Sequence, residues 1–344
     1  MPVLPVSRAF LHNGRRDGLL TIVATSAYHR RMLHSQEASP LATAIAVSRS
    51  LLAALRPKQW TKNLLMFLAV FFTINEAWDP GELQDLFSVL GRATLAVLIF
   101  SVLSGAVYLV NDLVDIDRDR FHRRKRLRPI ASGRLPIQVA RSSAVLLGLG
   151  GLAGAFVLEG SFGWVASGYI LTILSYSFAL KRIVVLDVLA ISAGFVLRAV
   201  AGAAVLDVPI SSWLYMCTGL GALFIALSKR RCELVDAGDG AADQRSALAQ
   251  YTTHLLDRLI AAAAVGAAVA YVLYTVTASN LPDNHAMLLT VPFVLLGLVR
   301  YVYLVQVKHI GEAPEELLTS DVLLIASVAL WLAVTATVLV AFRG

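Results

Sequence analysis

An acidic run in the first half of the chain has the residue types and spacing to hold a metal ion. It reads Asn111-Asp112-Leu113-Val114-Asp115-Ile116-Asp117-Arg118-Asp119. Spacings of three and four residues predict that Asp112, Asp115 and Asp119 share one helical face, with neighbouring carboxylates roughly 5 to 6 Å apart. Three like charges at this separation repel one another, and hard oxygen ligands suit Mg²⁺, which takes one or two carboxylates together with substrate phosphates. The run therefore predicts a site for a metal-bridged diphosphate.

A solvated acidic helix end is the alternative interpretation of this run. Eight basic side chains lie in the connection formed by residues 111–137 and can balance the carboxylates. The strict N-D-x-x-D-x-x-x-D spacing favours the metal site. Asp117 points away from the shared face, and we expect it to form a salt bridge.

The basic residues of the chain are mostly arginine. Of 30 basic residues 24 are Arg, and with 23 acidic residues the formal net charge is +7. The planar guanidinium group binds phosphate and carboxylate groups in a bidentate manner. The composition predicts an anionic substrate or lipid, and we expect no nucleic acid partner.

The elements that position these residues must be membrane-spanning helices. The chain has 344 residues, 57% of them apolar and 15% charged, and its mean hydropathy of +0.70 excludes a soluble globular protein. A span needs roughly 20 apolar residues, and continuous apolar runs exclude the period-two pattern of a transmembrane barrel. We therefore predict an all-α polytopic membrane protein with nine spans near residues 63–76, 87–110, 138–158, 162–180, 183–206, 211–228, 258–279, 286–306 and 320–342.

Charges in the loops predict the orientation of the spans. Connection 111–137 carries the eight bases and is expected to be cytoplasmic, whereas loop 76–86 carries acidic residues and no base. The sign alternates at every later crossing. The N-terminus is therefore expected in the cytoplasm and the C-terminus outside, with the polar site facing the cytoplasm.

The first 48 residues differ from the rest. They hold Arg15-Arg16 and Arg30-Arg31 but only one short apolar stretch, Leu19 to Ala27. We expect residues 1–48 to be a mostly disordered basic extension, or the product of an upstream start codon, followed by one transmembrane catalytic domain at residues 49–344. A signal peptide is the alternative. The helical spacing of Leu41 to Leu55 predicts a helix along the membrane surface.

One intramembrane charge stands out in the fifth predicted span. Arg198 lies deep in the run, where a charge is costly and normally faces a cavity or a partner. Asp187 precedes it by eleven residues, which is close to three turns, so both share a face about 16 Å apart along the axis. Both are expected to line a cavity; the alternatives are independent snorkelling or contacts that merely hold the bundle.

These motifs together resemble those of a known family. The N-D-x-x-D-x-x-x-D run, Arg128-Pro129-Ile130-Ala131-Ser132-Gly133, Arg56-Pro57 and Asn63 are similar to motifs of the UbiA-type superfamily of intramembrane prenyltransferases, over roughly residues 50–344. The resemblance implies nine helices around a cytoplasm-facing cavity. It also implies two aspartate motifs, each holding Mg²⁺ on a prenyl diphosphate.

The second aspartate motif is absent. Where it should stand the chain reads Ser228-Lys229-Arg230-Arg231-Cys232-Glu233-Leu234, so bare cations are expected to hold a phosphate directly. With the segment from Tyr176 to Arg182, this departure resembles the branch of decaprenyl-phosphate phosphoribosyltransferases of mycobacterial and corynebacterial cell-wall synthesis. The branch implies a pentosyltransferase that moves 5-phosphoribose from phosphoribosyl diphosphate (PRPP) to decaprenyl phosphate for arabinan and arabinogalactan synthesis.

The resemblance also implies roles for individual residues. Asp112, Asp115 and Asp119 are the expected catalytic ligands of Mg²⁺, and Asp187 is expected to orient a ribose hydroxyl or an oxocarbenium ion. The expected substrate-binding residues are Lys62, Asn63, Asn111, Arg126, Tyr176, Lys181, Arg182, Arg198, Lys229 and Arg230. The expected location is a bacterial plasma membrane, with membrane lipids as partners and homo-oligomers as an option.

Two other functions compete with this interpretation. An ordinary aromatic prenyltransferase of the same superfamily would use a prenyl diphosphate donor, but it needs two metal-carboxylate clamps and the chain supplies one. A membrane transporter or lipid-binding protein would use Asp187 and Arg198 as gating charges. That interpretation leaves the three-aspartate face unexplained.

Overall fold

A computed structural model describes residues 40–122, 124–209, 211–237, 247–308, 317 and 320–343. These residues contain no strand beyond one isolated bridge between Ile74 and Trp78, so the predicted all-α class is confirmed. The chain divides into two units, Met1–Arg49 and Ser50–Gly344. Of the predicted disordered extension, residues 1–39 lie outside the described residues, and residues 40–48 belong to a helix.

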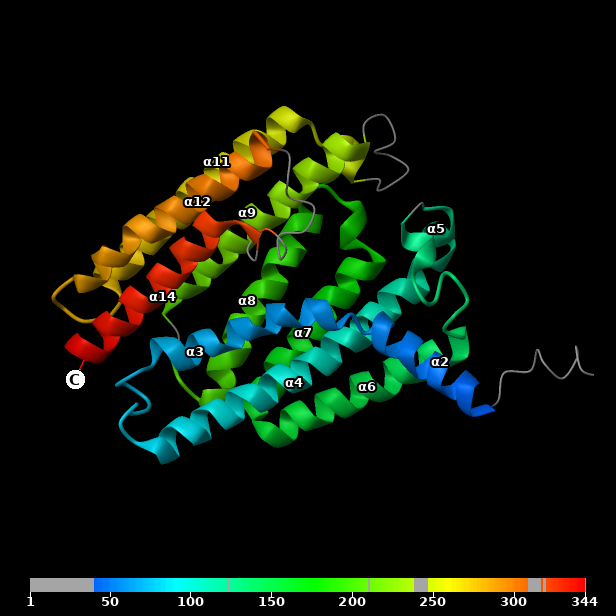
Figure 1. The fold of residues 1–344 in the computed structure, drawn as a ribbon, viewed down its shortest axis with the longest axis horizontal. Helices are drawn as coiled ribbons and strands as arrows, with labels where there is room; N and C mark the ends of the chain where they lie inside the picture. The colour runs from blue at the N-terminus through cyan, green and yellow to red at the C-terminus, as the bar shows by residue number, and fades with distance from the viewer. Residues whose placement is uncertain are drawn as a thin grey trace, which may run out of the picture. The chain divides into compact units, whose positions relative to one another are not determined.

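Figure 1 shows the helices in chain order. They are α2 (Pro40–Ala54), η1 (Pro57–Met66), α3 (Phe67–Phe72), α4 (Leu83–Val114), α5 (Ile116–Phe121), η2 (Lys125–Leu127), α6 (Ile137–Leu158), α7 (Gly160–Phe178), η3 (Leu180–Arg182), α8 (Leu186–Leu206), α9 (Ser212–Ala237), η5 (Leu248–Gln250), α11 (Thr253–Thr277), η6 (Ala286–Thr290), α12 (Val291–Gln306) and α14 (Val322–Phe342).

Six described helical segments are long and apolar enough to cross a membrane: α4, α6, α8, α11, η6 with α12, and α14. The predicted runs at 63–76, 162–180 and 211–228 form helices outside this set. The first is split into η1 and the six-residue α3, α7 includes four serines, and α9 continues into its basic end. A multi-pass membrane protein is therefore supported, and the count of nine spans stays a prediction.

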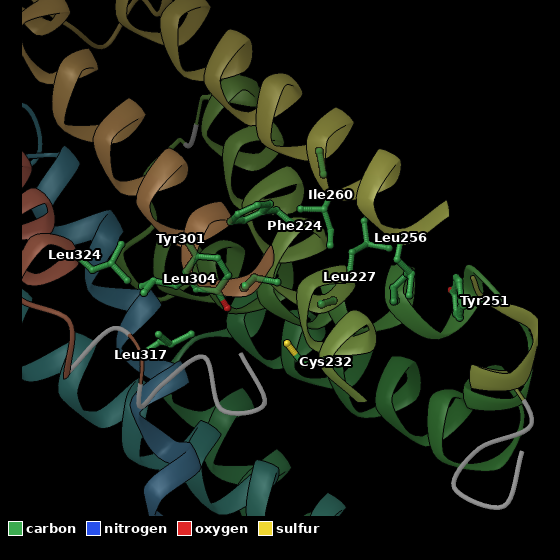
Figure 2. Packing of buried hydrophobic residues seen from close by; sticks show 14 residues of the cluster. Phe224, Leu227, Cys232, Tyr251, Leu256, Ile260, Tyr301, Leu304, Leu317 and Leu324 are labelled. Carbon is green, nitrogen blue, oxygen red and sulfur yellow. The ribbon is translucent and has the colours of Figure 1, made fainter. Parts of the chain in front are cut away.

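The helices of the second unit pack in neighbouring pairs. Helix α4 packs along α6, α7 along α8, and α9 between α8 and α11, while α12 packs along α14. Phe100, Phe162 and Tyr169 stack between α4 and α7. A second cluster joins α9, α11 and α12, and Figure 2 shows its residues from Phe224 to Leu324. The site described below lies on helices held by these clusters.

A glycine allows η1 to lie directly against α8. A Cβ atom at Gly202 would come within 2.2 Å of the backbone oxygen of Met66, a separation that real Cβ atoms essentially never show. Any side chain at position 202 would therefore push the two elements apart. This close approach brings Asn63 of η1 to α8.

Candidate functional site

The predicted aspartate motif lies where helix α4 ends. Asp112 occupies the last turn of α4, Asp115 caps it, and Asp119 belongs to the short α5 that follows. The expectation of one continuous helical face is wrong, because the backbone leaves the helical conformation at Asp115 (φ −95°, ψ 6°). The break separates the partners of Asp115 from those of the other two carboxylates.

Arg128 joins Asp112 to Asp119. Its Nη1 donates to Oδ1 of Asp112 at 3.1 Å and to Oδ2 of Asp119 at 2.5 Å, which places the two carboxylates side by side. Arg56 donates a second bond to the same Asp112 oxygen, at 2.5 Å, and stacks over the ring of Tyr108. Both aspartates are almost fully buried. No role was predicted for Arg56 or Arg128, although both residues lie in segments that carry the family resemblance, Arg56-Pro57 and Arg128 to Gly133.

Proline and glycine shape the backbone around these arginines. Arg56 precedes Pro57 and adopts a left-handed conformation (φ 54°, ψ 62°), and Arg128 precedes Pro129 in an extended conformation. A residue before proline is disfavoured in the α region, so neither arginine continues a helix. Gly133 (φ 75°) turns the chain back after Pro129, with Ile130 and Leu135 buried on either side of the turn.

Lys181 binds the third aspartate from a distant part of the chain. Its Nζ donates to both carboxylate oxygens of Asp115, at 2.7 and 2.8 Å. Lys181 lies in η3, between α7 and α8, and its side chain is 8% exposed. The structure therefore places this predicted phosphate ligand on the aspartate motif itself.

Asp187, Arg230 and Tyr251 form a second cluster near the start of α8. Asp187 is fully buried; its Oδ2 accepts from Nε of Arg230 at 2.7 Å, and its Oδ1 accepts from the hydroxyl of Tyr251 at 2.9 Å. Arg230 also binds Glu233 at 2.5 Å and lies 3.5 Å from the hydroxyl of Tyr176. Asp187 thus orients a cation of α9.

The expectation of bare cations at residues 229–231 is wrong for two of the three. Arg230 is paired with Asp187 and Glu233, and Arg231 donates to Asp257 at 2.5 Å. Such pairing is what burial demands, since an unpaired charge is expensive to bury. The spacing of Arg230 and Glu233 along one helix was visible in the sequence. Asp187 and Asp257 belong to other helices, so their pairing with Arg230 and Arg231 was not visible.

Arg198 sits in a third, deeper cluster. It donates to Oδ1 of Asn63 and to the hydroxyl of Tyr169, each at 2.8 Å, and its guanidinium stacks over the Tyr169 ring. Asn63 in turn donates to Ser101 at 3.0 Å. Over the ranges that the structure describes, no carboxylate pairs with Arg198. The predicted Asn63 and Arg198 are therefore brought together, and Tyr169 is an additional member that the sequence did not single out.

Other predicted substrate-binding residues stay outside these clusters. Lys62 donates to Gln59 at 2.5 Å. Within the part of the chain that is described, no side-chain hydrogen bond or ion pair is formed by the four residues Asn111, Arg126, Arg182 and Lys229. Arg126 and Arg182 are exposed, and Asn111 and Lys229 are half-buried. Asp239 and Asp243, two acidic residues that follow the basic run in the sequence, lie outside the described residues.

The aspartate cluster carries mixed charge. Burial raises the pKa of Asp119, although Arg128 beside it acts in the opposite direction. Among the described residues no group of three or more His, Cys, Asp or Glu side chains forms a metal cage by itself. Mg²⁺ usually keeps several waters and binds through one or two carboxylates plus substrate phosphates. The adjacent carboxylates of Asp112 and Asp119 fit that mode of binding, and the flanking guanidinium groups suit an anion.

Comparison with known proteins places the chain among membrane transferases. Residues 64–320 match the model of the UbiA prenyltransferase family. Proteins named decaprenyl-phosphate phosphoribosyltransferase are 33% identical over 280 residues in Mycobacterium tuberculosis, covering 81% of this chain and 91% of the relative, and 32% identical over 297 residues in Mycolicibacterium smegmatis, covering 83% and 92%.

A solved structure shares the fold. The UbiA homologue from Archaeoglobus fulgidus, described as bound to GPP and Mg²⁺, superposes with a TM-score of 0.64 at 19% identity. The likeness covers 85% of this chain and 99% of that one. It supports the predicted helical architecture.

Proposed function

The chain belongs to the UbiA prenyltransferase family, and from that premise we propose that it transfers 5-phosphoribose from PRPP to decaprenyl phosphate or a similar polyprenyl phosphate. The observation that carries the proposal is the aspartate cluster of Asp112, Asp115 and Asp119, which is bound by three cations, Arg56, Arg128 and Lys181. Carboxylates suit a metal-bound diphosphate, and cations beside them suit further phosphate oxygens. PRPP presents both a diphosphate and a 5-phosphate.

The donor is proposed to bind with its diphosphate at Asp112 and Asp119. These two carboxylates would hold Mg²⁺, which when bound would supply charge stabilisation for the departing diphosphate. Arg128 contacts both carboxylates and keeps them side by side. Lys181 holds Asp115 in the same way, so the rotamers of all three carboxylates are set by cations before the donor arrives.

The acceptor needs little activation. A phosphate monoester has a second pKa of about 6 and is largely ionised at neutral pH, so a strong general base is unnecessary. Positioning of donor and acceptor then dominates catalysis. Attack from the face opposite the diphosphate inverts the anomeric carbon and gives a β-linked polyprenylphosphoryl 5-phosphoribose. The exposed Arg182 and the half-buried Lys229 are proposed to contact the remaining phosphates.

Asp187 is assigned a different role from the one that the resemblance implied. Its carboxylate is fully buried and both oxygens are engaged, by Arg230 and Tyr251. We therefore propose that Asp187 is a positioning residue, which acts by holding Arg230 in place. The proposed location is a bacterial plasma membrane with the site facing the cytoplasm, and the lipid product would serve arabinan synthesis.

Transfer of radiolabel tests this proposal. Purified wild type and the Asp115→Asn variant are offered labelled PRPP and decaprenyl phosphate in detergent, with Mg²⁺ or with a chelator. We expect label in the lipid phase only for wild type with Mg²⁺. Label transfer that survives both chelation and the substitution would refute the assigned role of the aspartate cluster, and absence of transfer under every condition would refute the proposed reaction.

A further inference from the structure

Tyr251 contacts the candidate site, although it belongs to none of the motifs predicted from the sequence. It is the residue that caps the end of η5, two positions before α11 begins, and its side chain is buried at one end of the cluster shown in Figure 2. Its hydroxyl forms two hydrogen bonds to the start of α8. It accepts from the backbone N–H of Val185 at 2.8 Å and donates to Oδ1 of Asp187 at 2.9 Å. Burial raises the pKa of Tyr251 to about 12, so the hydroxyl remains a donor at neutral pH.

The backbone that Tyr251 holds is strained. Val185 has φ 71° and ψ −46°, a positive φ in a β-branched residue, which is a genuine outlier. Val185 is 45% exposed, so packing alone holds it only in part. Strained residues persist when surrounding contacts over-determine them, and they gather at functional sites. The bond from Val185 N–H to Tyr251 is such a contact.

The strained backbone at Val185 forms a corner between η3 and α8, and each of these two segments carries one ion pair of the site. On its N-terminal side η3 carries Lys181, which binds both oxygens of Asp115. On its C-terminal side the first turn of α8 carries Asp187, which binds Arg230. Relaxation of Val185 to a negative φ would turn these two segments relative to each other. The geometry of both pairs therefore depends on the corner.

We propose that Tyr251 is a positioning residue whose hydroxyl holds the corner at Val185 and thereby places Lys181 on Asp115 and Asp187 on Arg230. Tyr251 acts through these groups and touches neither donor nor acceptor. The kinetic consequence rests on the proposed phosphoribosyl transfer, whereas the structural consequence does not. The experiment therefore has one arm for each.

Hydrogen exchange tests the structural arm. The full chain in detergent is compared with Tyr251→Phe, and exchange is followed in the peptide that contains the Val185 amide. Removing the hydroxyl should speed exchange of that amide about fivefold, the effect of one lost hydrogen bond. Tyr271→Phe is the matched control, since the Tyr271 hydroxyl also makes two bonds, to Thr290 and Trp331, in another core cluster. Unchanged exchange in Tyr251→Phe would overturn the proposal.

Steady-state kinetics test the functional arm. Tyr251→Phe should raise KM for PRPP about tenfold, as loss of a supporting partner does. Since Lys181 lies on the donor side, KM for the polyprenyl phosphate should change little, and neither constant should change in Tyr271→Phe. Adding Val185→Gly to Tyr251→Phe should restore part of the donor affinity, because glycine adopts positive φ without strain.

The outcomes of the two arms are distinguishable. Equal loss of thermal stability in both tyrosine variants with no change in KM for PRPP would show a purely structural role and overturn the proposal. Failure of wild type to transfer phosphoribose would refute the proposed function, and the exchange arm would still judge whether Tyr251 holds the corner.

Discussion

Lys181 donates to both carboxylate oxygens of Asp115, although the two residues are 66 positions apart in the chain. One belongs to the turn between α7 and α8, and the other caps α4. The aspartate motif is therefore completed by a separate segment of the chain. The positions of its carboxylates depend on three basic side chains, Arg56, Arg128 and Lys181, as well as on the geometry of the helix.

Replacement of Lys181 by Met should lower kcat/KM for PRPP about 10- to 100-fold, the usual effect of losing a partner of a ligand group. The Asp115 carboxylate would keep its charge and lose its orientation. Lys181→Arg should recover only part of the activity, because a planar guanidinium does not reproduce the compact ammonium group. Initial rates at varied PRPP measure the effect, and a wild-type kcat/KM in Lys181→Met would contradict the assigned role.

The acid limb of the pH profile should depend on Arg128. Burial raises the pKa of Asp119 and Arg128 lowers it, so removing the guanidinium raises the pKa further. A carboxyl group with a raised pKa takes up its proton at a higher pH, and the protonated form is a poor metal ligand. Arg128→Gln should therefore lose activity at a higher pH than wild type as the pH falls. The pH dependence of kcat/KM measures this shift, with the exposed Arg141→Gln as control; identical acid limbs would contradict the prediction.

Gly202→Ala should destabilise the protein by about 1 to 3 kcal/mol, the usual effect of overpacking a close contact. The added methyl group would meet backbone atoms of Met66, which cannot move aside like a side chain. Gly150→Ala is the matched control, because nothing lies within 4 Å of a Cβ atom there. Thermal unfolding in detergent compares the two. Equal stability of both variants would mean that η1 and α8 do not require this contact.

Asn63 and Arg198 should show strong energetic coupling. Arg198→Lys removes the guanidinium that donates hydrogen bonds to both Asn63 and Tyr169. Asn63→Ala leaves the buried guanidinium without one acceptor. A double-mutant cycle on unfolding should give a coupling energy of about 0.5 to 3 kcal/mol. Additive effects would show that the two side chains do not act together.

Local patterns predicted much of this site. Hydropathy and charge predicted a helical membrane protein. The spacing of the acidic run singled out Asp112, Asp115 and Asp119, which lie at the end of α4 and in α5 directly after it. Arg198 was found because a charge deep in a span is rare. Each of these features is encoded within a short stretch of chain.

The partners of these residues required the fold. The break at Asp115, the ion pair between Asp187 and Arg230, and the hydroxyl of Tyr251 depend on which helices meet. The basic run at residues 229–231 was therefore misinterpreted as unpaired. Spacing along one helix says nothing about acidic residues that another helix brings to it.

Competition between donors tests the central claim most directly. Purified protein is offered PRPP and a prenyl diphosphate together, with decaprenyl phosphate and an aromatic acceptor present, and the lipid products are identified by mass spectrometry. We predict that decaprenyl phosphate gains one 5-phosphoribosyl group in a Mg²⁺-dependent manner and that the aromatic acceptor is unchanged. A prenylated aromatic product with unmodified decaprenyl phosphate would contradict the claim and assign the chain to aromatic prenyl transfer.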